Sequence, residues 1–292
     1  MAECIICKSS DLEYRDTVIS DFVMARIDPR FVNGNVPNTP TRLCFCKNCT
    51  FAFYEYRISD EESERLYNNY RDGDYQQLRE KYECWYTEQV NDALNNDLKQ
   101  LRRQKARINH MIKNNIRTEI RSALDYGGNE GKTFFSGVGT EERYVYDISG
   151  IDVIDGITKI SDFDELRRHN YDFIMTNMLF EHLADPVEVL RKLYELGSND
   201  TYYYIEVPSE NPFIKGNKFG ILKNLHLLAD PVYNNLRLAK YYFVQKNQPP
   251  MPMKEHINFF TQKSMRFLAK NCGFYIVDMC ENDVLYVLLK KI

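Results

Sequence analysis

The sequence lacks an apolar run of the ~20 residues that a membrane span requires, so no membrane-spanning helix is predicted. Its acidic beginning, at Glu3, is not followed by the apolar segment of about 7–15 residues that a signal peptide contains, and a cytoplasmic protein is expected. Neither sign of charge is in large excess, because the net charge is only −4. Such a balance gives no electrostatic basis for a nucleic-acid or membrane-surface partner.

The length and composition are those of an ordinary globular protein. A chain of 292 residues is long enough for roughly two domains, and 43% hydrophobic and 27% charged residues are ordinary shares. From the motifs described below we expect a small zinc-binding domain over residues 1–56, a helical linker or cap over 57–117, and an α/β domain over 118–292.

Two cysteine pairs stand in the first 56 residues, as Cys4-x-x-Cys7 and Cys46-x-x-Cys49. Without a leader segment, cysteines are expected to be thiols or metal ligands rather than disulfides. Two such pairs can converge as four thiolates around a tetrahedral zinc, and a site closed by four sulfurs is structural rather than catalytic. Ordinary buried thiols are the alternative. Cys44 also shares a strand face with Cys46 and could replace it as a ligand.

Residues 59–115 have a charged, helical pattern, which Gly73 is expected to divide. The basic run within residues 94–116 is interpreted as a solvated helix face. Aromatic residues recur along the segment, either to pack on the next domain or to contact a ligand. They are Tyr67, Tyr70, Tyr75, Tyr82, Trp85 and Tyr86.

A glycine-rich turn follows the first expected strand of the α/β domain, which covers residues 122–125. The strand ends at Asp125, and the turn contains Gly127, Gly128 and Gly131 before the expected start of a helix. Open α/β sheets bind ligands at the carboxyl ends of their strands, where small residues allow a close approach to the main chain. The N–H groups at a helix start would suit a carboxylate or a phosphate.

Asp147 ends a second expected strand, 22 positions after Asp125. A carboxylate at about this distance beyond a glycine-rich turn typically binds the ribose hydroxyls of a nucleoside ligand. The alternative is an aspartate that only caps a turn at the end of its strand.

The remaining elements alternate between strands and helices, which predicts a Rossmann-like, mostly parallel sheet. A closing hairpin around residues 281–283 requires one antiparallel strand near the C-terminus. Residues 209–255 are too long for an ordinary connection and are expected to form a lid or an interface, through which the protein could oligomerise. Further strands are expected within 152–160 and over 171–177, 201–207, 274–280 and 284–289, with helices over 186–196 and 261–271.

Several segments of the α/β domain together resemble class I S-adenosylmethionine-dependent methyltransferases. Residues 125–131 resemble the family's first motif, although Asn129 stands at its middle glycine, and Asp147 falls at its ribose-binding acid. Residues 171–186, with Glu181-His182-Leu183-Ala184-Asp185-Pro186, resemble its fourth-strand signature. Residues 256–261 and 272–274 resemble the late helix of a large bacterial subgroup.

With the cysteine pairs and Tyr67-x-x-Tyr70-Arg71, these segments are similar to sugar C-methyltransferases that carry an N-terminal zinc domain. The resemblance covers about residues 118–292, and the C-terminal domain of those enzymes has no counterpart in it. It implies S-adenosylmethionine and a structural zinc as cofactors. The residues implied for S-adenosylmethionine are Gly127, Gly128 and Gly131 beside its methionine part, Asp147 at the ribose, Ile148 at the adenine, Asn177 facing the methyl group, and Asp125, which would order the turn.

The candidates for a general base are His182, His256 and Glu206, with Glu181 beside them. Histidine has an unperturbed pKa suited to proton abstraction near neutral pH. The expected activity is methylation of a sugar, a nucleotide sugar or a glycan in polysaccharide or natural-product biosynthesis. One alternative is an O- or N-methyltransferase for another small molecule. The other is a non-catalytic assembly module that combines a degenerate α/β domain with a zinc knuckle.

Overall fold

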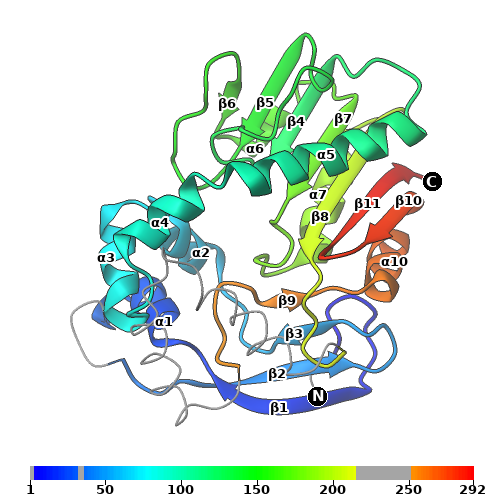
Figure 1. The fold of residues 1–292 in the computed structure, drawn as a ribbon. Helices are drawn as coiled ribbons and strands as arrows, with labels where there is room; N and C mark the ends of the chain where they lie inside the picture. Colours follow the sequence, from blue (N-terminus) through cyan, green and yellow to red (C-terminus); the bar gives the residue numbers. More distant parts are fainter. Residues whose placement is uncertain (1–2, 32–35, 215–250) are drawn as a thin grey trace.

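A computed structural model describes residues 3–31, 36–214 and 251–292 of the protein. Its strands form a sheet of seven and a smaller sheet of four, and the helices α1 to α4 lie beside the smaller sheet (Figure 1). None of the helices in these ranges has the length and apolar character that a membrane crossing requires.

The large sheet has the order β10-β11-β8-β7-β4-β5-β6. The strands β4 to β8 pair in parallel, whereas β11 is antiparallel to both β8 and β10. The predicted α/β sheet with one antiparallel strand near the C-terminus is therefore confirmed. The strand order reverses between β4 and β7, which is where sheets of this type bind ligands. The strands are β4 (Ser122–Tyr126), β5 (Glu142–Tyr146), β6 (Thr158–Ile160), β7 (Phe173–Asn177), β8 (Tyr202–Pro208), β10 (Phe274–Glu281) and β11 (Val284–Lys291).

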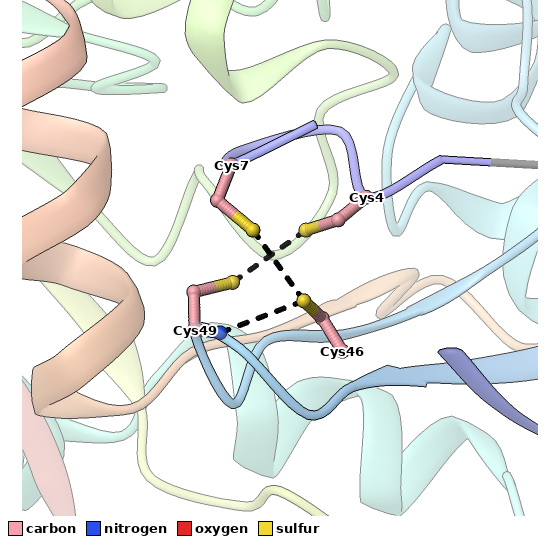
Figure 2. A group of neighbouring side chains, drawn as sticks. All are labelled: Cys4, Cys7, Cys46 and Cys49. Atoms are coloured by element: carbon pink, nitrogen blue, oxygen red, sulfur yellow. Dashed lines mark hydrogen bonds between the residues drawn. The ribbon is translucent and has the colours of Figure 1, made fainter. Parts of the chain in front are cut away.

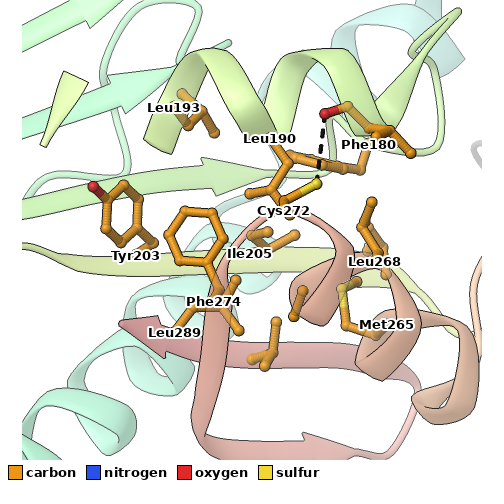
Figure 3. Packing of buried hydrophobic residues seen from close by; sticks show 14 of the residues in the cluster. Phe180, Leu190, Leu193, Tyr203, Ile205, Met265, Leu268, Cys272, Phe274 and Leu289 are labelled. Atoms are coloured by element: carbon orange, nitrogen blue, oxygen red, sulfur yellow. Dashed lines mark hydrogen bonds between the residues drawn. The ribbon is translucent and has the colours of Figure 1, made fainter. Parts of the chain in front are cut away.

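Helices cover both faces of the large sheet. On one face lie α7 (Pro186–Leu196) and α10 (Gln262–Asn271), whose leucines pack with residues of β8 and β11 (Figure 3). The long helix α5 (Leu98–Asn115) crosses the other face, where Ile108 and Met111 are fully buried (Figure 1). A short helix, α6 (Phe163–Leu166), follows β6.

The helical segment before α5 contains three more helices, α2 (Asp60–Tyr67), α3 (Gly73–Tyr82) and α4 (Glu88–Asn95). Gly73 is the first residue of α3, and the side chain of Asp72 caps that helix by accepting from the N–H of Tyr75. The predicted break at Gly73 is confirmed. These helices share an aromatic core with α1 (Asp21–Ile27), which is followed by the turn η1 (Pro29–Phe31).

The small sheet joins an early part of the chain to a segment from late in the chain. Its strands are β1 (Leu12–Val18), β2 (Pro40–Cys46), β3 (Ala52–Tyr54) and β9 (Asn258–Phe259). Because β9 pairs with β3, a late segment of the chain completes the N-terminal sheet. The proposed division into residues 1–56, 57–117 and 118–292 stays a prediction. The pairing of β9 with β3 shows that a segment of the third range contributes to the sheet of the first.

The helix expected after the glycine-rich turn is absent. Residues 131–141 form only turns and bends between β4 and β5. Glycines at 131, 137 and 139 disfavour a helix there, and Phe134 and Val138 instead pack with α5. The predicted anion site at a helix N-terminus is therefore wrong for this turn.

The insertion expected over residues 209–255 is described only at its two ends. Residues 215–250 lie outside the described residues, and so does the predicted lid or oligomer interface.

Candidate functional site

The glycine-rich turn lies where the strand order reverses, at the carboxyl end of β4. Gly127 and Gly131 have φ angles of 77° and 78°, and Asn129, at 52°, shares this left-handed region, which asparagine tolerates better than most residues. A Cβ at Gly128 would lie 2.5 Å from the carboxyl carbon of Asp125, so only glycine fits there without movement. The turn therefore forms despite the asparagine at its middle position.

Asp125 is completely buried beneath this turn. Its carboxylate accepts a hydrogen bond from the hydroxyl of Thr133 and a longer one, at 3.4 Å, from the amide of Asn177. Burial raises its pKa to about 7, although the two hydrogen bonds act in the opposite direction. These contacts agree with an indirect role for Asp125 in ordering the turn.

The raised pKa of Asp125 predicts a pH dependence of stability that Asp125→Asn removes. A carboxyl whose pKa is raised by folding stabilises the folded state fully below its unfolded value of 3.8, and that contribution is lost as the pH rises to about 7. Urea unfolding at about pH 5 and about pH 8 should show a drop for the wild type larger than that for Asp125→Asn, by roughly 3 kcal/mol at most. An equal drop in both proteins, with the exposed-site variant Asp155→Asn as control, would contradict the assignment.

Asp147 lies beside the turn, at the end of β5. One of its carboxylate oxygens accepts from the backbone N–H of Asn129 at 2.9 Å, and the other accepts from that of Ser149 at 2.7 Å. An ionised carboxylate has about four acceptor sites, so two stay available to a ligand. The predicted proximity of Asp147 to the glycine-rich turn thus exists in the structure.

Three buried polar atoms around the turn have no hydrogen-bond partner among the described residues. They are the amide oxygens of Asn129 and Asn177 and the hydroxyl oxygen of Ser149. Buried polar groups are normally paired, so these three atoms fit contacts to a polar ligand. Ile148, the residue predicted to lie at the adenine, leaves 52% of its surface exposed.

A pair of histidines lies near this turn: His182 is in the segment that follows β7, and His256 is in the segment that precedes β9. A Cβ at Gly127 would lie 2.9 Å from the side chain of Leu179, three residues before His182. The rings of His182 and His256 meet edge to face, with their centroids 4.8 Å apart. The carboxylate of Glu181 completes this cluster, and one donor atom from each of the three residues lies within 4.8 Å of the others.

The environment separates the pKa values of the three side chains. Burial raises the pKa of Glu181 to about 8. Burial, with the charge of His256, lowers the pKa of His182 to about 4. Burial acts to lower the pKa of His256 as well, but the carboxylate of Glu210 outweighs it and the result is about 9.

Helix α3 positions the segment that carries His256. Glu255 accepts a hydrogen bond from Tyr75 at 2.5 Å and pairs with Arg79 at 3.0 Å, and Arg79 in turn binds Glu83 at 2.8 Å. The guanidinium of Arg79 is thus neutralised by two carboxylates. Tyr75 and Arg79 are both buried in this network.

Glu206 is fully buried at the end of β8 and is bound on both oxygens. Arg107 of α5 donates to them at 2.5 and 2.8 Å, and the hydroxyl of Tyr204 donates at 2.6 Å. A carboxylate held in this way is poorly placed to accept a proton from a substrate. Its contacts indicate that it fixes α5 to the sheet, which also means that the basic face of α5 is not entirely solvated.

The four cysteines of the two pairs converge near the small sheet (Figure 2). The sulfurs of Cys4 and Cys49 lie 3.5 Å apart, and those of Cys7 and Cys46 lie 3.4 Å apart. All four sulfurs are within 4.8 Å of one another. The donor set and the close grouping of the four sulfurs fit a structural zinc, as the spacing predicted.

The two cysteine turns have the same backbone form. The residue after each pair has a positive φ, 59° at Lys8 and 61° at Thr50. Its N–H donates to the carbonyl of the first cysteine, from Lys8 to Cys4 at 2.9 Å and from Thr50 to Cys46 at 2.8 Å. Cys44 is buried but is not part of the cluster, so the structure favours Cys46 as the fourth ligand.

Two contacts of the site were not expected from the sequence. Tyr67 contacts Nδ1 of His182 at 2.9 Å, and Glu210 is hydrogen-bonded to Nδ1 of His256. The sequence contains one signal for this cluster, because both histidines belong to Glu-His dipeptides, at 181–182 and 255–256. Only the fold shows that these dipeptides meet.

A protein-family model described as a methyltransferase domain matches residues 82–279, which is more than half of the chain. No curated protein matches the chain.

Solved structures with a similar fold are methyltransferases of low sequence identity. Magnesium protoporphyrin IX methyltransferase from Synechocystis, with bound SAH, is 11% identical over 66% of this chain and 84% of its own, with a TM-score of 0.42. Mitomycin 7-O-methyltransferase is 11% identical over 66% and 54%, with a TM-score of 0.39. A SAM-dependent methyltransferase from Aquifex aeolicus is 13% identical over 59% and 82%, with a TM-score of 0.36.

Proposed function

Because the chain belongs to the methyltransferase domain family, we propose that it transfers the methyl group of S-adenosylmethionine to a sugar, a nucleotide sugar or a glycan. Methyl transfer from S-adenosylmethionine is the activity of that family. The observation that supports the site is the pairing of Asp147 with the backbone of the glycine-rich turn. The sugar is the more specific part of the proposal.

The cofactor would be held by the residues at the carboxyl ends of β4, β5 and β7. The main chain at Gly127, Gly128 and Gly131 would allow the methionine part to approach. Asp147 would accept hydrogen bonds from the ribose hydroxyls. Ile148 would cover the adenine, and Asn177 would lie near the methyl group. When bound, the cofactor supplies an electrophilic methyl group on a sulfonium, so the protein mainly has to align the two reactants.

The acceptor would lie against the cluster of Glu181, His182 and His256. Tyr67 and Tyr70, whose ring centroids are 5.8 Å apart, adjoin it from the end of α2 and the turn that follows. The backbone N–H of Asn69 donates to the carbonyl of Ser149 at 3.3 Å, so this turn also covers the Asp147 loop. Tyrosine rings beside hydrogen-bonding groups suit a sugar, and this supports polysaccharide or natural-product biosynthesis as the setting.

Two of the three base candidates, His182 and His256, belong to the proposed acceptor site, whereas Glu206 is occupied by Arg107. We propose that the histidine cluster activates the acceptor. A small molecule outside sugar chemistry, methylated on oxygen or nitrogen, would use the same arrangement and is the second candidate. Family membership favours either enzyme over a non-catalytic assembly module. The cysteine cluster is proposed to hold a structural zinc.

Calorimetric titration is expected to show one S-adenosylmethionine bound per chain, and its demethylated product should compete for the same site. Transfer of a labelled methyl group to a panel of nucleotide sugars, beside a panel of phenols and amines of similar size, then tests the acceptor. Labelling of the sugars alone would support the proposal. Labelling of phenols or amines alone would reject the sugar as acceptor and support the second candidate. A folded protein that binds neither S-adenosylmethionine nor its demethylated product would overturn the proposed activity.

A further inference from the structure

We propose that Glu181, His182 and His256 form a binding site for a divalent first-row metal cation, separate from the cysteine cluster. The inference rests on the proposed function, because the cation would activate the methyl acceptor. The donor atoms of the three side chains lie within 4.8 Å of one another. Bound nitrogen and oxygen ligands lie about 2.0–2.2 Å from zinc, so small side-chain rotations would bring all three donors onto one ion.

The histidines are oriented as metal ligands usually are. Nδ1 of His182 lies 2.9 Å from the carbonyl oxygen of Glu255, which can only accept, so this nitrogen carries the proton. Nδ1 of His256 is hydrogen-bonded to the carboxylate of Glu210. A ligating histidine typically presents its other nitrogen to a carbonyl or carboxylate in this way. Both Nε2 atoms are then left to coordinate, and that of His182 lies 3.8 Å from Glu181.

Glu181 supplies a second and independent indication. Its side chain is 1% exposed, and neither carboxylate oxygen has a hydrogen-bond partner among the described residues. A buried carboxylate without a partner is costly, whereas buried charges normally pair or coordinate metals. The backbone oxygen of Glu181 accepts from the N–H groups of Ile257 and Asn258, at 2.8 and 3.0 Å. The main chain therefore fixes this carboxylate next to the segment that carries His256.

The chemistry of the donors indicates the class of metal. Two imidazoles and one carboxylate suit zinc, iron or cobalt, whereas four thiolates select zinc. Three protein ligands leave coordination positions open, as in catalytic rather than structural sites. The acceptor would therefore offer the cation an oxygen, from a hydroxyl or a carbonyl group.

A cation at this site would polarise that oxygen and lower the pKa of an acceptor hydroxyl, whose proton would leave to solvent. The oxygen lone pair would then form the new bond to the methyl carbon. The carbon–sulfur bond breaks as that bond forms, and its electrons remain on the sulfur. The products are the methylated acceptor and the neutral demethylated cofactor.

Cobalt(II) titration of protein that carries one zinc per chain tests the site, because four thiolates select zinc and the second site is then left for cobalt. Calorimetry and visible absorption are expected to show one cobalt per chain, with nitrogen and oxygen ligands and no thiolate charge-transfer band. Glu181→Gln and His256→Gln should each weaken cobalt binding by about tenfold or more. The matched control is His110→Gln, which removes an exposed histidine of α5 and should leave the affinity unchanged.

The affinity of each variant for the demethylated cofactor, with its zinc content, shows whether the protein is folded. Absence of saturable cobalt binding by folded wild-type protein would overturn the metal site, and so would equal affinities in the wild type and both cluster variants. If the wild type binds cobalt but neither form of the cofactor, the proposed function fails and the metal site stands.

Discussion

The double substitution Cys4→Ser and Cys46→Ser is expected to remove the zinc and to unfold the protein at ambient temperature. A structural zinc contributes about 10–16 kcal/mol in zinc-finger peptides, as much as the whole stability of about 5–15 kcal/mol of a typical protein. Both cysteines are fully buried, in one core cluster with Phe260 and Met265. Loss of the metal should therefore destabilise the large sheet as well as the small one.

Elemental analysis and thermal unfolding measure the two effects. The wild type, purified without added metal, should contain about one zinc per chain, held by the four cysteines. Cys44→Ala is the matched control, because Cys44 is buried in the same strand as Cys46 but is not one of the four cysteines that would hold the zinc. It should retain the zinc and lose at most a few kcal/mol. Zinc that persists in the double variant, or disappears in the Cys44→Ala variant, would show that the ligands are assigned wrongly.

Local signals in the sequence were enough for much of the fold. Helix α7 was predicted over residues 186–196 from Pro186, and Asp185 caps it by accepting from the N–H groups of Val187 and Glu188. The strands β7 and β8 were predicted from continuous apolar runs, because a parallel strand buried on both faces needs no alternation of apolar and polar residues. The cysteine cluster also follows from spacing alone. In these helices and strands, and within each cysteine pair, the residues that determine the structure are neighbours in sequence.

Features that depend on distant residues could not be predicted in this way. The strand β9 has two residues and exists because Ala52 and Phe53 offer it an edge, some 200 positions earlier. Glu206 was a reasonable base candidate until the fold brought Arg107 onto it, 99 positions away. The missing helix after Gly131 reflects a conflict between a familiar motif and local glycines. Such outcomes depend on which surfaces meet.

Asp147→Ala is expected to weaken S-adenosylmethionine binding by about 100-fold or more. Two charge-assisted hydrogen bonds to the ribose would be lost, each worth about 1.5–3 kcal/mol, and every 1.4 kcal/mol is tenfold. The same carboxylate also accepts from the N–H groups of Asn129 and Ser149, so its removal loosens the turn. Titration calorimetry on the wild type and the variant measures the change, and Asp155→Ala, at an exposed site, should bind as the wild type does.

A cofactor analogue separates ribose recognition from support of the turn. If Asp147 binds the ribose hydroxyls, an S-adenosylhomocysteine analogue that lacks both of them has nothing to lose when the carboxylate is removed. In Asp147→Ala its affinity should then fall only through the loosened turn, whereas that of S-adenosylhomocysteine should fall considerably more. An equal loss for both ligands would mean that Asp147 acts only through the turn at Asn129 and Ser149, and the ribose assignment would be rejected.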